Sequence, residues 1–247
     1  AQVDYILEAG SDHLGVEVAV DWQETHRTLR YLVATDYVGP KARYGLPFGS
    51  IDRPQQPGTD REEAMWEVPG SRWAAVLDHA GERGLALLTE AKFGFSCRAG
   101  LLGLTLLRSS THPDQVADKG SHRIRFAVGA YSAGDGSVAS TAAAADAVYA
   151  PAPIISGGTA RSAPFTLDAR TSLVPSWVLP EADGKGYVIR FHETAGRSGT
   201  MAVTLNRPAR KIDLVDFTGK IVGKVQRRGD TVRFAYAPFQ VVSLRVR

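Results

Sequence analysis

"GVEVAVDW", residues Gly15–Trp22, decides the fold class, because its apolar residues recur at every second position. Val16, Val18 and Val20 point to one side of an extended chain. Trp22 lies on the same side, while the residues between them, two of them acidic, point to the other. This alternation is typical of an antiparallel β-strand with one buried face.

The same period of two continues through most of the chain. In "HRIRFAVGAY" it assigns two faces: Ile124, Phe126 and Val128 inward, and Arg123, Arg125 and Ala127 outward. Further strands are expected over "TLRYLVAT", "MWEVP", "RWAAVLDH", "GLALLTEA", "FGFSCR" and "LLGLTLLR", and near the C-terminus over "GYVIRFHE", "GTMAVTL", "TVRFAYA" and "QVVSLRVR". Short turns rich in Gly, Pro and Asp separate these stretches. An all-β sandwich or barrel is therefore expected.

One helix and one domain boundary interrupt this pattern. The alanine-rich stretch Ser137–Ala150 favours a helix, which Pro151 ends. The segment that follows, "PAPIISGGTARSAP", is rich in Pro, Gly and Ser, so a boundary is expected near residue 160. We expect a large β-sandwich over residues 1–160 and a smaller one over residues 161–247.

Composition limits the classes of function. The 247 residues are 44% hydrophobic and 22% charged, and no apolar run reaches the roughly 18 residues of a membrane-spanning helix. The single cysteine, Cys97, and the absence of a glycosylation sequon at Asn206 favour a cytoplasmic protein. The segment from Arg207 to Arg247 contains ten Lys or Arg but only three Asp or Glu. Without a nucleic-acid module this segment predicts a solvated basic face, so neither nucleic acid nor a membrane is expected as a partner.

"HPDQVADKGSH", residues 112–122, is the most suggestive polar stretch. Four of its side chains carry atoms that bind zinc: His112, Asp114, Asp118 and His122. Pro113 and Gly120 exclude the helical spacing that would bring such ligands together. The stretch is therefore interpreted as a polar loop between strands, and no metal is expected in it.

No self-contained catalytic group is expected either. The chain has no Gly-x-Ser-x-Gly motif, and Cys97 falls in an alternating run, where a small packed side chain is expected rather than a nucleophile. Glycoside hydrolysis needs two carboxylates about 5–9 Å apart. The sequence alone cannot pair the scattered candidates Asp52, Glu67, Asp78 and Glu90.

Several stretches together resemble the C-terminal part of the α-mannosidases of glycoside hydrolase family 38, in the branch with the cytosolic animal enzyme and many bacterial ones. The matching stretches are "VDWQETHRTLRYLV", "YGLPFGSIDRP", "WEVPGSRWAAVLD", residues 84–131, "GYVIRFHETAGRSG" and "APFQVVSLRV". The long stretch includes the family's pattern of Leu107, Arg108, Pro113, Asp114, Asp118, Gly120 and His122.

The resemblance implies a large antiparallel supersandwich, similar to galactose mutarotase and begun before Ala1, followed by a smaller β-sandwich. It implies a retaining α-mannosidase whose barrel, with zinc and the catalytic carboxylates, and whose helical region lie outside this chain. An exposed sheet edge is then expected where strands are lacking. No cofactor is expected in the chain itself. The implied partners are the catalytic and helical domains of the same enzyme and a mannose-containing carbohydrate.

The resemblance also implies a sugar-facing loop. Asp118, Lys119 and Gly120 are the substrate-binding candidates, with His122 as a supporting residue. Related enzymes have Arg at the position of Lys119. A purely structural role, in which His122 and Asp118 pin the loop, is the alternative. At the family-like turn "GSIDRP", Asp52 is expected to pair with the adjacent arginine or to cap the chain.

Three functions stay open. The first is an accessory β-domain of an α-mannosidase, inactive alone. The second is an autonomous carbohydrate-binding module that uses exposed tryptophans, although all four (Trp22, Trp66, Trp73 and Trp177) occur in strand patterns typical of a core. The third is a structural module that braces the barrel and binds no ligand.

Overall fold

The computed structural model describes residues 1–132, 139–150, 156, 163–168 and 172–247. The chain divides into two compact units. The first comprises Ala1–Pro47, Ile51–Gly134 and Ser140–Ala152, and the second comprises Phe48–Ser50, Asp135–Ala139 and Pro153–Arg247. The boundary expected near residue 160 falls in residues 157–162, outside the described part, and stays a prediction.

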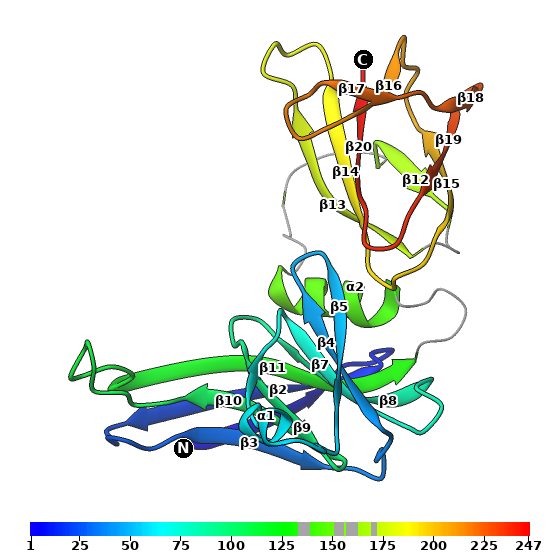
Figure 1. Cartoon of the computed structure of the whole chain (residues 1–247). Helices are drawn as coiled ribbons and strands as arrows, with labels where there is room; N and C mark the ends of the chain where they lie inside the picture. The colour runs from blue at the N-terminus through cyan, green and yellow to red at the C-terminus, as the bar shows by residue number, and fades with distance from the viewer. Residues whose placement is uncertain (133–138, 151–155, 157–162, 169–171) are drawn as a thin grey trace. The chain divides into compact units, whose positions relative to one another are not determined.

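The first unit contains two antiparallel sheets (Figure 1). The larger has seven strands in the order β1 (Gln2–Leu7), β2 (His13–Trp22), β11 (Gly120–Ser132), β8 (Arg83–Thr89), β7 (Trp73–Leu77), β4 (Lys41–Leu46) and β5 (Gly49–Pro54). The smaller has four strands in the order β3 (Leu29–Ala34), β10 (Leu101–Leu107), β9 (Gly94–Arg98) and β6 (Val68–Pro69). The expected large antiparallel β-sandwich is confirmed.

The core of this unit lies between the two sheets. The alternation of β2 places Val16, Val18 and Val20 in it, as expected. From the smaller sheet, Phe95 and Leu104 pack against them, and both are fully buried. Burial of this apolar surface is the main favourable contribution to the stability of the unit.

Helix α2 (Ala139–Tyr149) covers part of the opposite face of the larger sheet (Figure 1). The expected helix is thus confirmed, although its predicted start at Ser137 lies outside the described residues. Ala127 was predicted to face outward. It does lie on that face, but it is buried, because Ala145 and Val148 of the helix pack in the same cluster.

The stretch "MWEVP" forms a strand only at Val68–Pro69. Residues 65–67 belong to no helix or strand. They follow a short helix, α1 (Asp60–Ala64), which the sequence did not predict. The side chain of Thr59 caps this helix by accepting a hydrogen bond from the Glu62 amide at 3.3 Å. Acidic residues in the first turn complement the positive end of the helix.

The second unit is a smaller sandwich of two antiparallel sheets. One has five strands in the order β13 (Leu173–Pro180), β14 (Tyr187–Glu193), β20 (Val241–Val246), β16 (Ile212–Val215) and β17 (Ile221–Gly223). The other has four in the order β12 (Phe165–Leu167), β15 (Gly199–Leu205), β19 (Thr231–Tyr236) and β18 (Gln226–Arg228). Its core is built around Ile189, Phe191, Met201, Val203 and Val232, which are fully buried. The expected smaller β-sandwich is confirmed.

The described part of the chain holds just two α-helices, and neither has the length and apolar character needed to span a lipid bilayer.

Candidate functional site

The candidate loop connects the ends of β10 and β11, and Asp118 organises it. Asp118 adopts a left-handed backbone conformation, with φ of 62°, which Asp tolerates better than most residues. Its Oδ2 atom accepts hydrogen bonds from the backbone amides of Arg108 at 2.8 Å and Ser109 at 3.0 Å. These two bonds, followed by the charges of Lys92 and His122, hold the pKa of Asp118 below its usual value. The Asp118 carboxylate therefore fixes the beginning of the loop, where the chain leaves β10.

The end of the loop is fixed from the following strand. The Nε2 atom of His122 lies 2.7 Å from the carbonyl oxygen of Asp118. Inside the loop, the Lys119 amide donates to the Val116 carbonyl at 3.0 Å, and the Val116 amide donates to Asp114 Oδ1 at 2.9 Å. Asp118 and His122 thus make the contacts expected for residues that pin the loop.

Gly120 and Lys119 are positioned differently from this pinned pair. Gly120 has a φ of 120°, a conformation that L side chains rarely adopt, and an added Cβ would meet open space. It lies opposite Trp22 in the β2–β11 ladder, and the Trp22 indole donates to the Ser109 hydroxyl. The Lys119 side chain is exposed. The loop therefore presents an exposed lysine beside a half-buried glycine on a braced backbone.

The four potential metal ligands of this loop do not form a metal site. Asp114 is exposed and Asp118 is bound to two amides. Among the described residues, no group of three or more His, Cys, Asp or Glu side chains could hold a metal ion. The side chains of this part of the chain therefore do not fit a zinc ion.

The scattered carboxylates are each engaged by a neighbouring protein group. Their partners are Arg43 for Asp52, Thr105 for Glu67, the Glu82 amide for Asp78 and Arg125 for Glu90.

The expected pairing of Asp52 with its neighbour Arg53 is wrong. Successive side chains of a strand point to opposite faces, so Asp52 instead pairs with Arg43 across the sheet, with Nε–Oδ1 at 2.6 Å. The Arg53 guanidinium lies over the ring of Tyr44, 5.7 Å from its centroid.

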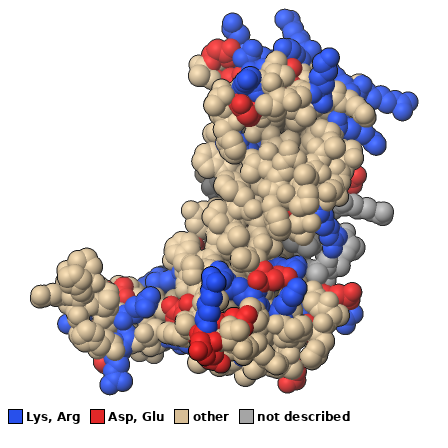
Figure 2. Space-filling view, in the orientation of Figure 1, with Lys and Arg blue, Asp and Glu red and all other residues tan. Residues whose placement is uncertain are grey.

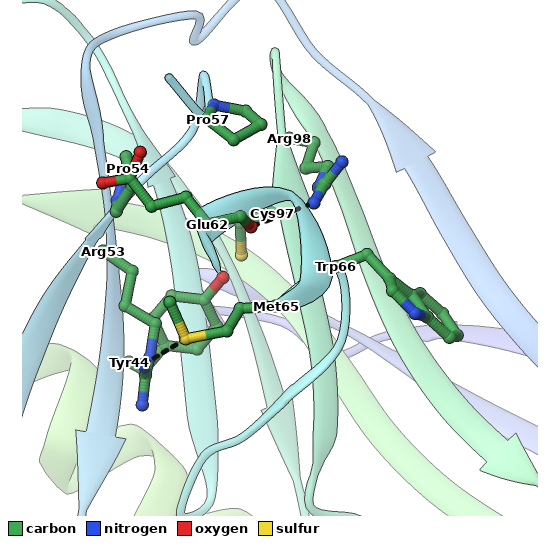
Figure 3. Close-up of a pocket in the computed structure, with 9 residues that line it drawn as sticks. All are labelled: Tyr44, Arg53, Pro54, Pro57, Glu62, Met65, Trp66, Cys97 and Arg98. Carbon is green, nitrogen blue, oxygen red and sulfur yellow. Dashed lines mark hydrogen bonds between the residues drawn. The ribbon is translucent and has the colours of Figure 1, made fainter. Parts of the chain in front are cut away.

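A small pocket lies beside α1 (Figure 3). Cys97 and Tyr44 line it, and Arg98 closes part of it by donating to the Glu63 carbonyl at 2.6 Å. Its volume of about 20 Å³ has room for little more than one water molecule. Burial raises the pKa of the Cys97 thiol to about 12. Cys97 is therefore a packed, protonated residue, as expected, and not a nucleophile.

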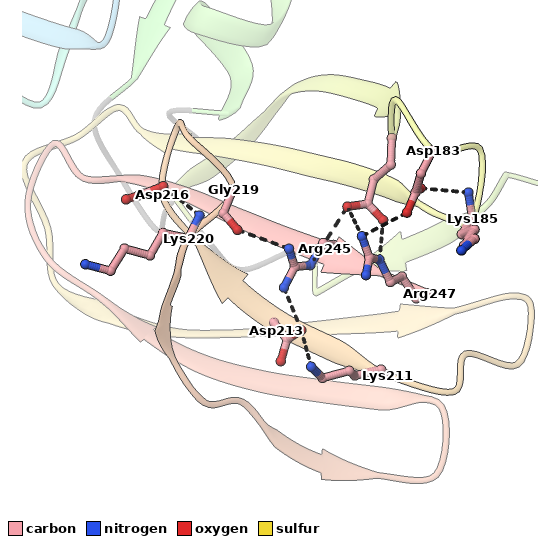
Figure 4. Close-up of polar contacts among 10 residues, drawn as sticks. Asp183, Lys185, Lys211, Asp213, Asp216, Gly219, Lys220, Arg245 and Arg247 are labelled. Atoms are coloured by element: carbon pink, nitrogen blue, oxygen red, sulfur yellow. Dashed lines mark hydrogen bonds and ion pairs between the residues drawn. The ribbon is translucent and has the colours of Figure 1, made fainter.

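Three of the ten Lys and Arg residues of the basic C-terminal segment, Lys211, Arg245 and Arg247, form ion pairs with described residues. Lys and Arg side chains gather around the part of the second unit that holds the C-terminus (Figure 2). Arg245 Nη2 lies 3.0 Å from Asp213 Oδ2, and Arg247 Nε lies 2.5 Å from Glu181 Oε2 (Figure 4). This arrangement is typical of a solvated charged face.

The four tryptophans divide into two classes. Trp73 is buried and Trp22 is half-buried, as expected for core residues. Trp66 and Trp177 are exposed, so the expectation that they belong to the core is wrong for these two. Trp177 lies in strand β13 on an uncovered face, whereas Trp66 lies outside any strand, just before β6.

Comparison with known proteins shows a shared fold. A crystal structure of an α-mannosidase from Enterococcus faecalis V583 superposes with a TM-score of 0.76 at 17% identity, over 96% of this chain and 28% of that one. The model for the glycosyl hydrolases family 38 C-terminal domain matches residues 2–116. Residues 2–116, just under half of the chain, are therefore similar to that family.

Curated relatives extend the similarity to nearly the whole chain. Alpha-mannosidase 2C1 of Homo sapiens is 27% identical over 98% of this chain and 24% of its own length. Alpha-mannosidase G of Dictyostelium discoideum is 28% identical over 81% of this chain and 19% of its own length. The chain therefore spans at most about a quarter of these relatives.

Proposed function

We propose that this chain is the C-terminal β-region of a retaining, zinc-dependent α-mannosidase that hydrolyses terminal α-D-mannosidic linkages. Two observations support the proposal: the family match over residues 2–116 and the α-mannosidase relatives, which are about four times longer than the chain. Among the described residues, no group of three or more His, Cys, Asp or Glu side chains could hold a metal ion. In this proposal the chain is inactive by itself, and its role is to brace the catalytic domain and complete the sugar site.

The loop held by Asp118 and His122 supports the second part of this role, which is to complete the sugar site. Asp118 and His122 are engaged in fixing its backbone, so they act on sugar only through the loop that they hold. Lys119 and the backbone at Gly120 are left to face a ligand. A loop braced at both ends places such groups precisely, as a binding site requires.

The partners follow from the same proposal. The catalytic and helical domains of the enzyme contact this region, a mannose-containing carbohydrate is the substrate, and the cytoplasm is the compartment. Zinc, when bound in the catalytic domain, serves to hold mannose hydroxyls and polarise the reacting sugar. The residues of this chain contribute position and hydrogen bonds.

The decisive experiment is hydrolysis of a chromogenic α-mannoside, with and without added zinc, by this chain and by the longer product of the same gene. We expect turnover only by the longer protein. Turnover by the 247-residue chain would contradict the assignment of an inactive region.

Within the longer protein, Lys119→Ala tests the loop directly. We expect KM for the mannoside to rise several-fold with unchanged folding stability, because an exposed side chain is removed. Lys185→Ala, another exposed lysine in the second unit, is the matched control and should leave KM unchanged. Equal KM values for Lys119→Ala and the parent would remove Lys119 from the sugar site.

A second candidate function, carbohydrate binding by the chain alone, is favoured by one surface of the second unit. Trp177 is 59% exposed and lies opposite Arg190 in the β13–β14 ladder. The Arg190 guanidinium in turn lies over Phe217, 4.5 Å from the ring centroid. Two exposed aromatic rings flanking a hydrogen-bond donor suit a sugar ring.

Titration of the chain with methyl α-mannoside and with a mannan, followed by calorimetry, tests this candidate. Saturable binding that Trp177→Ala abolishes would support it. Absence of binding to both ligands would leave the bracing role alone.

A further inference from the structure

The outer face of the smaller sheet in the first unit carries two opposite charges that lie against it. Thr105 follows the core residue Leu104 in β10, so its side chain points to this outer face. Arg30 lies opposite Thr105 in the β3–β10 ladder and points to the same side. The Glu67 carboxylate accepts a hydrogen bond from the Thr105 hydroxyl at 2.6 Å, and its Oε2 atom lies 4.0 Å from Arg30 Nε.

Two glycines make room for these charged side chains. A Cβ added at Gly103 would lie 2.6 Å from the hydroxyl oxygen of Ser96 and 2.7 Å from Arg30 Nη2, which donates to that hydroxyl. A Cβ added at Gly94 would lie 2.9 Å from Glu67 Oε1. Only 22% of the Arg30 side chain and 11% of the Glu67 side chain are exposed. The neighbouring residues therefore hold both charged groups in fixed positions.

An exposed tryptophan borders this pair. The Arg30 guanidinium lies 5.6 Å from the centroid of the Trp66 ring, and Trp66 is 49% exposed. Its indole points away from Cys97 (Figure 3). An aromatic ring beside fixed hydrogen-bonding groups suits a sugar, because the ring packs on the C–H groups of the sugar while the polar groups bind its hydroxyls.

The same series of contacts leads to the candidate sugar-facing loop. The Nη1 atom of Arg108 lies 3.9 Å from Glu67 Oε1, and the Arg108 amide donates to Asp118 at 2.8 Å. The Arg108 side chain is 69% exposed and therefore open to a ligand. Trp66 is thus connected with the loop through the side chains of three charged residues. A ligand that touches both ends of this series contains more than one sugar unit.

We propose that these four residues bind the further sugar units of an oligosaccharide whose terminal mannose lies at the loop: Trp66, Arg30, Glu67 and Arg108. This inference rests on the proposed function, because the loop defines where the terminal unit lies. Trp66 packs against one of the further units, and the charged groups bind hydroxyls. The four residues offer donors and an acceptor together, as hydroxyl groups require, whereas a bound anion would need donors alone.

A comparison of two substrates in the longer product of the same gene tests the proposal. For Trp66→Ala we expect kcat/KM for a linear α-mannotriose to fall about two- to tenfold relative to kcat/KM for the chromogenic α-mannoside, because one aromatic contact is lost. Trp66→Phe retains a ring and should keep most of this preference for the longer substrate.

Two further variants complete the experiment. Glu67→Gln keeps the shape of the side chain but removes its charge, and it should lower the ratio of the two kcat/KM values in the same direction. Val222→Ala, at an exposed apolar position of β17 in the second unit, is the matched control and should leave that ratio unchanged.

Three outcomes would overturn the proposal: no hydrolysis of mannotriose by the parent protein, an unchanged ratio in both Trp66→Ala and Glu67→Gln, or an equal loss on both substrates. If the longer protein does not hydrolyse the chromogenic mannoside, the proposed function has failed, and calorimetric titration with mannotriose then decides this inference separately. Binding that Trp66→Ala weakens would support it. Absence of binding, or binding that Trp66→Ala leaves unchanged, would overturn it.

Discussion

The Nε2 atom of His122 lies 2.7 Å from the carbonyl oxygen of Asp118, so the first residues of β11 hold the loop that precedes them. The carboxylate of the same Asp118 holds the amides that follow β10. One residue thus connects both ends of the candidate sugar-facing loop, through its carbonyl group on one side and its side chain on the other.

Removal of the imidazole should loosen this loop without unfolding the sandwich. For His122→Ala we expect a free energy of unfolding lower by about 1 kcal/mol, the usual contribution of one hydrogen bond. Amide hydrogen exchange at Val116 and Lys119 should become faster. Urea unfolding and exchange mass spectrometry measure the two effects, with Lys119→Ala as a control of unchanged stability. Unaltered exchange in the variant would show that the His122 contact does not hold the loop.

Glu193 should make the second unit sensitive to acid. Its buried carboxylate accepts hydrogen bonds from the amides of Ala195 at 2.8 Å, Gly196 at 2.7 Å and Phe239 at 2.8 Å. Burial raises the pKa of Glu193, but hydrogen bonds from Ser172 and the surrounding amides outweigh it, and the pKa lies below the ordinary value. The stabilisation is therefore present above the pKa of an unfolded Glu, about 4.3, and is lost as the pH falls through the folded value.

The variant Glu193→Gln tests this sign. At about pH 7 we expect it to lower the free energy of unfolding by about 2 kcal/mol, because charge-assisted bonds become neutral ones. The difference from the parent protein should shrink as the pH falls from about 7 through the folded pKa of Glu193, because the parent carboxylate then becomes protonated. Urea midpoints across this range measure it, and a constant difference would contradict the assigned role of the charge.

Gln55 should be among the costliest residues to replace in the first unit. Its fully buried side chain donates to the carbonyls of Lys41 at 2.9 Å and Leu77 at 3.0 Å, and accepts from the Gly100 amide at 3.0 Å. Gln55→Leu removes a hydrogen bond from each of these three backbone groups, although the Leu77 carbonyl keeps the Gly39 amide as a partner. We therefore expect a loss of about 3 kcal/mol. The exposed Gln23→Leu, in contrast, should change stability by less than about 0.5 kcal/mol. Thermal or urea unfolding distinguishes the two.

Cys97 should be unreactive while the protein is folded. Its thiol is buried and its pKa is raised to about 12, and the thiolate is the reactive form. Ellman's reagent should therefore label the native protein only at the slow rate of unfolding and label the urea-unfolded chain rapidly. Rapid labelling of the native protein would show that the pocket beside α1 is open.

The β-sandwich architecture could be predicted from alternation because a two-residue period directly encodes which side chains share a face. Val16, Val18 and Val20 illustrate this, and all three are core residues. Alternation cannot say what covers each face. Ala127 and Trp177 were misplaced for that reason: a helix covers the first, and the second faces solvent. Trp66 was misplaced because the strand expected there begins only at Val68.

For the candidate loop, the sequence named Asp118, Lys119, Gly120 and His122 through a family resemblance. Only the structure separates their roles. The hydrogen bonds of Asp118 and His122 depend on a left-handed backbone turn and on the position of Arg108, which directly follows β10. The pairing of Asp52 with Arg43 likewise depends on the tertiary structure. The partner of Asp52 comes from a neighbouring strand and is not the adjacent residue.

The sequence by itself determined the all-β class, the helix before residue 150, the packed state of Cys97 and the family resemblance. These depend on local periodicity and on residue identity, which are written along the chain. The tertiary structure decided which carboxylates are engaged and which tryptophans are exposed. Each of these depends on residues that are distant in sequence, and their meeting follows from sheet order and register rather than from any local pattern.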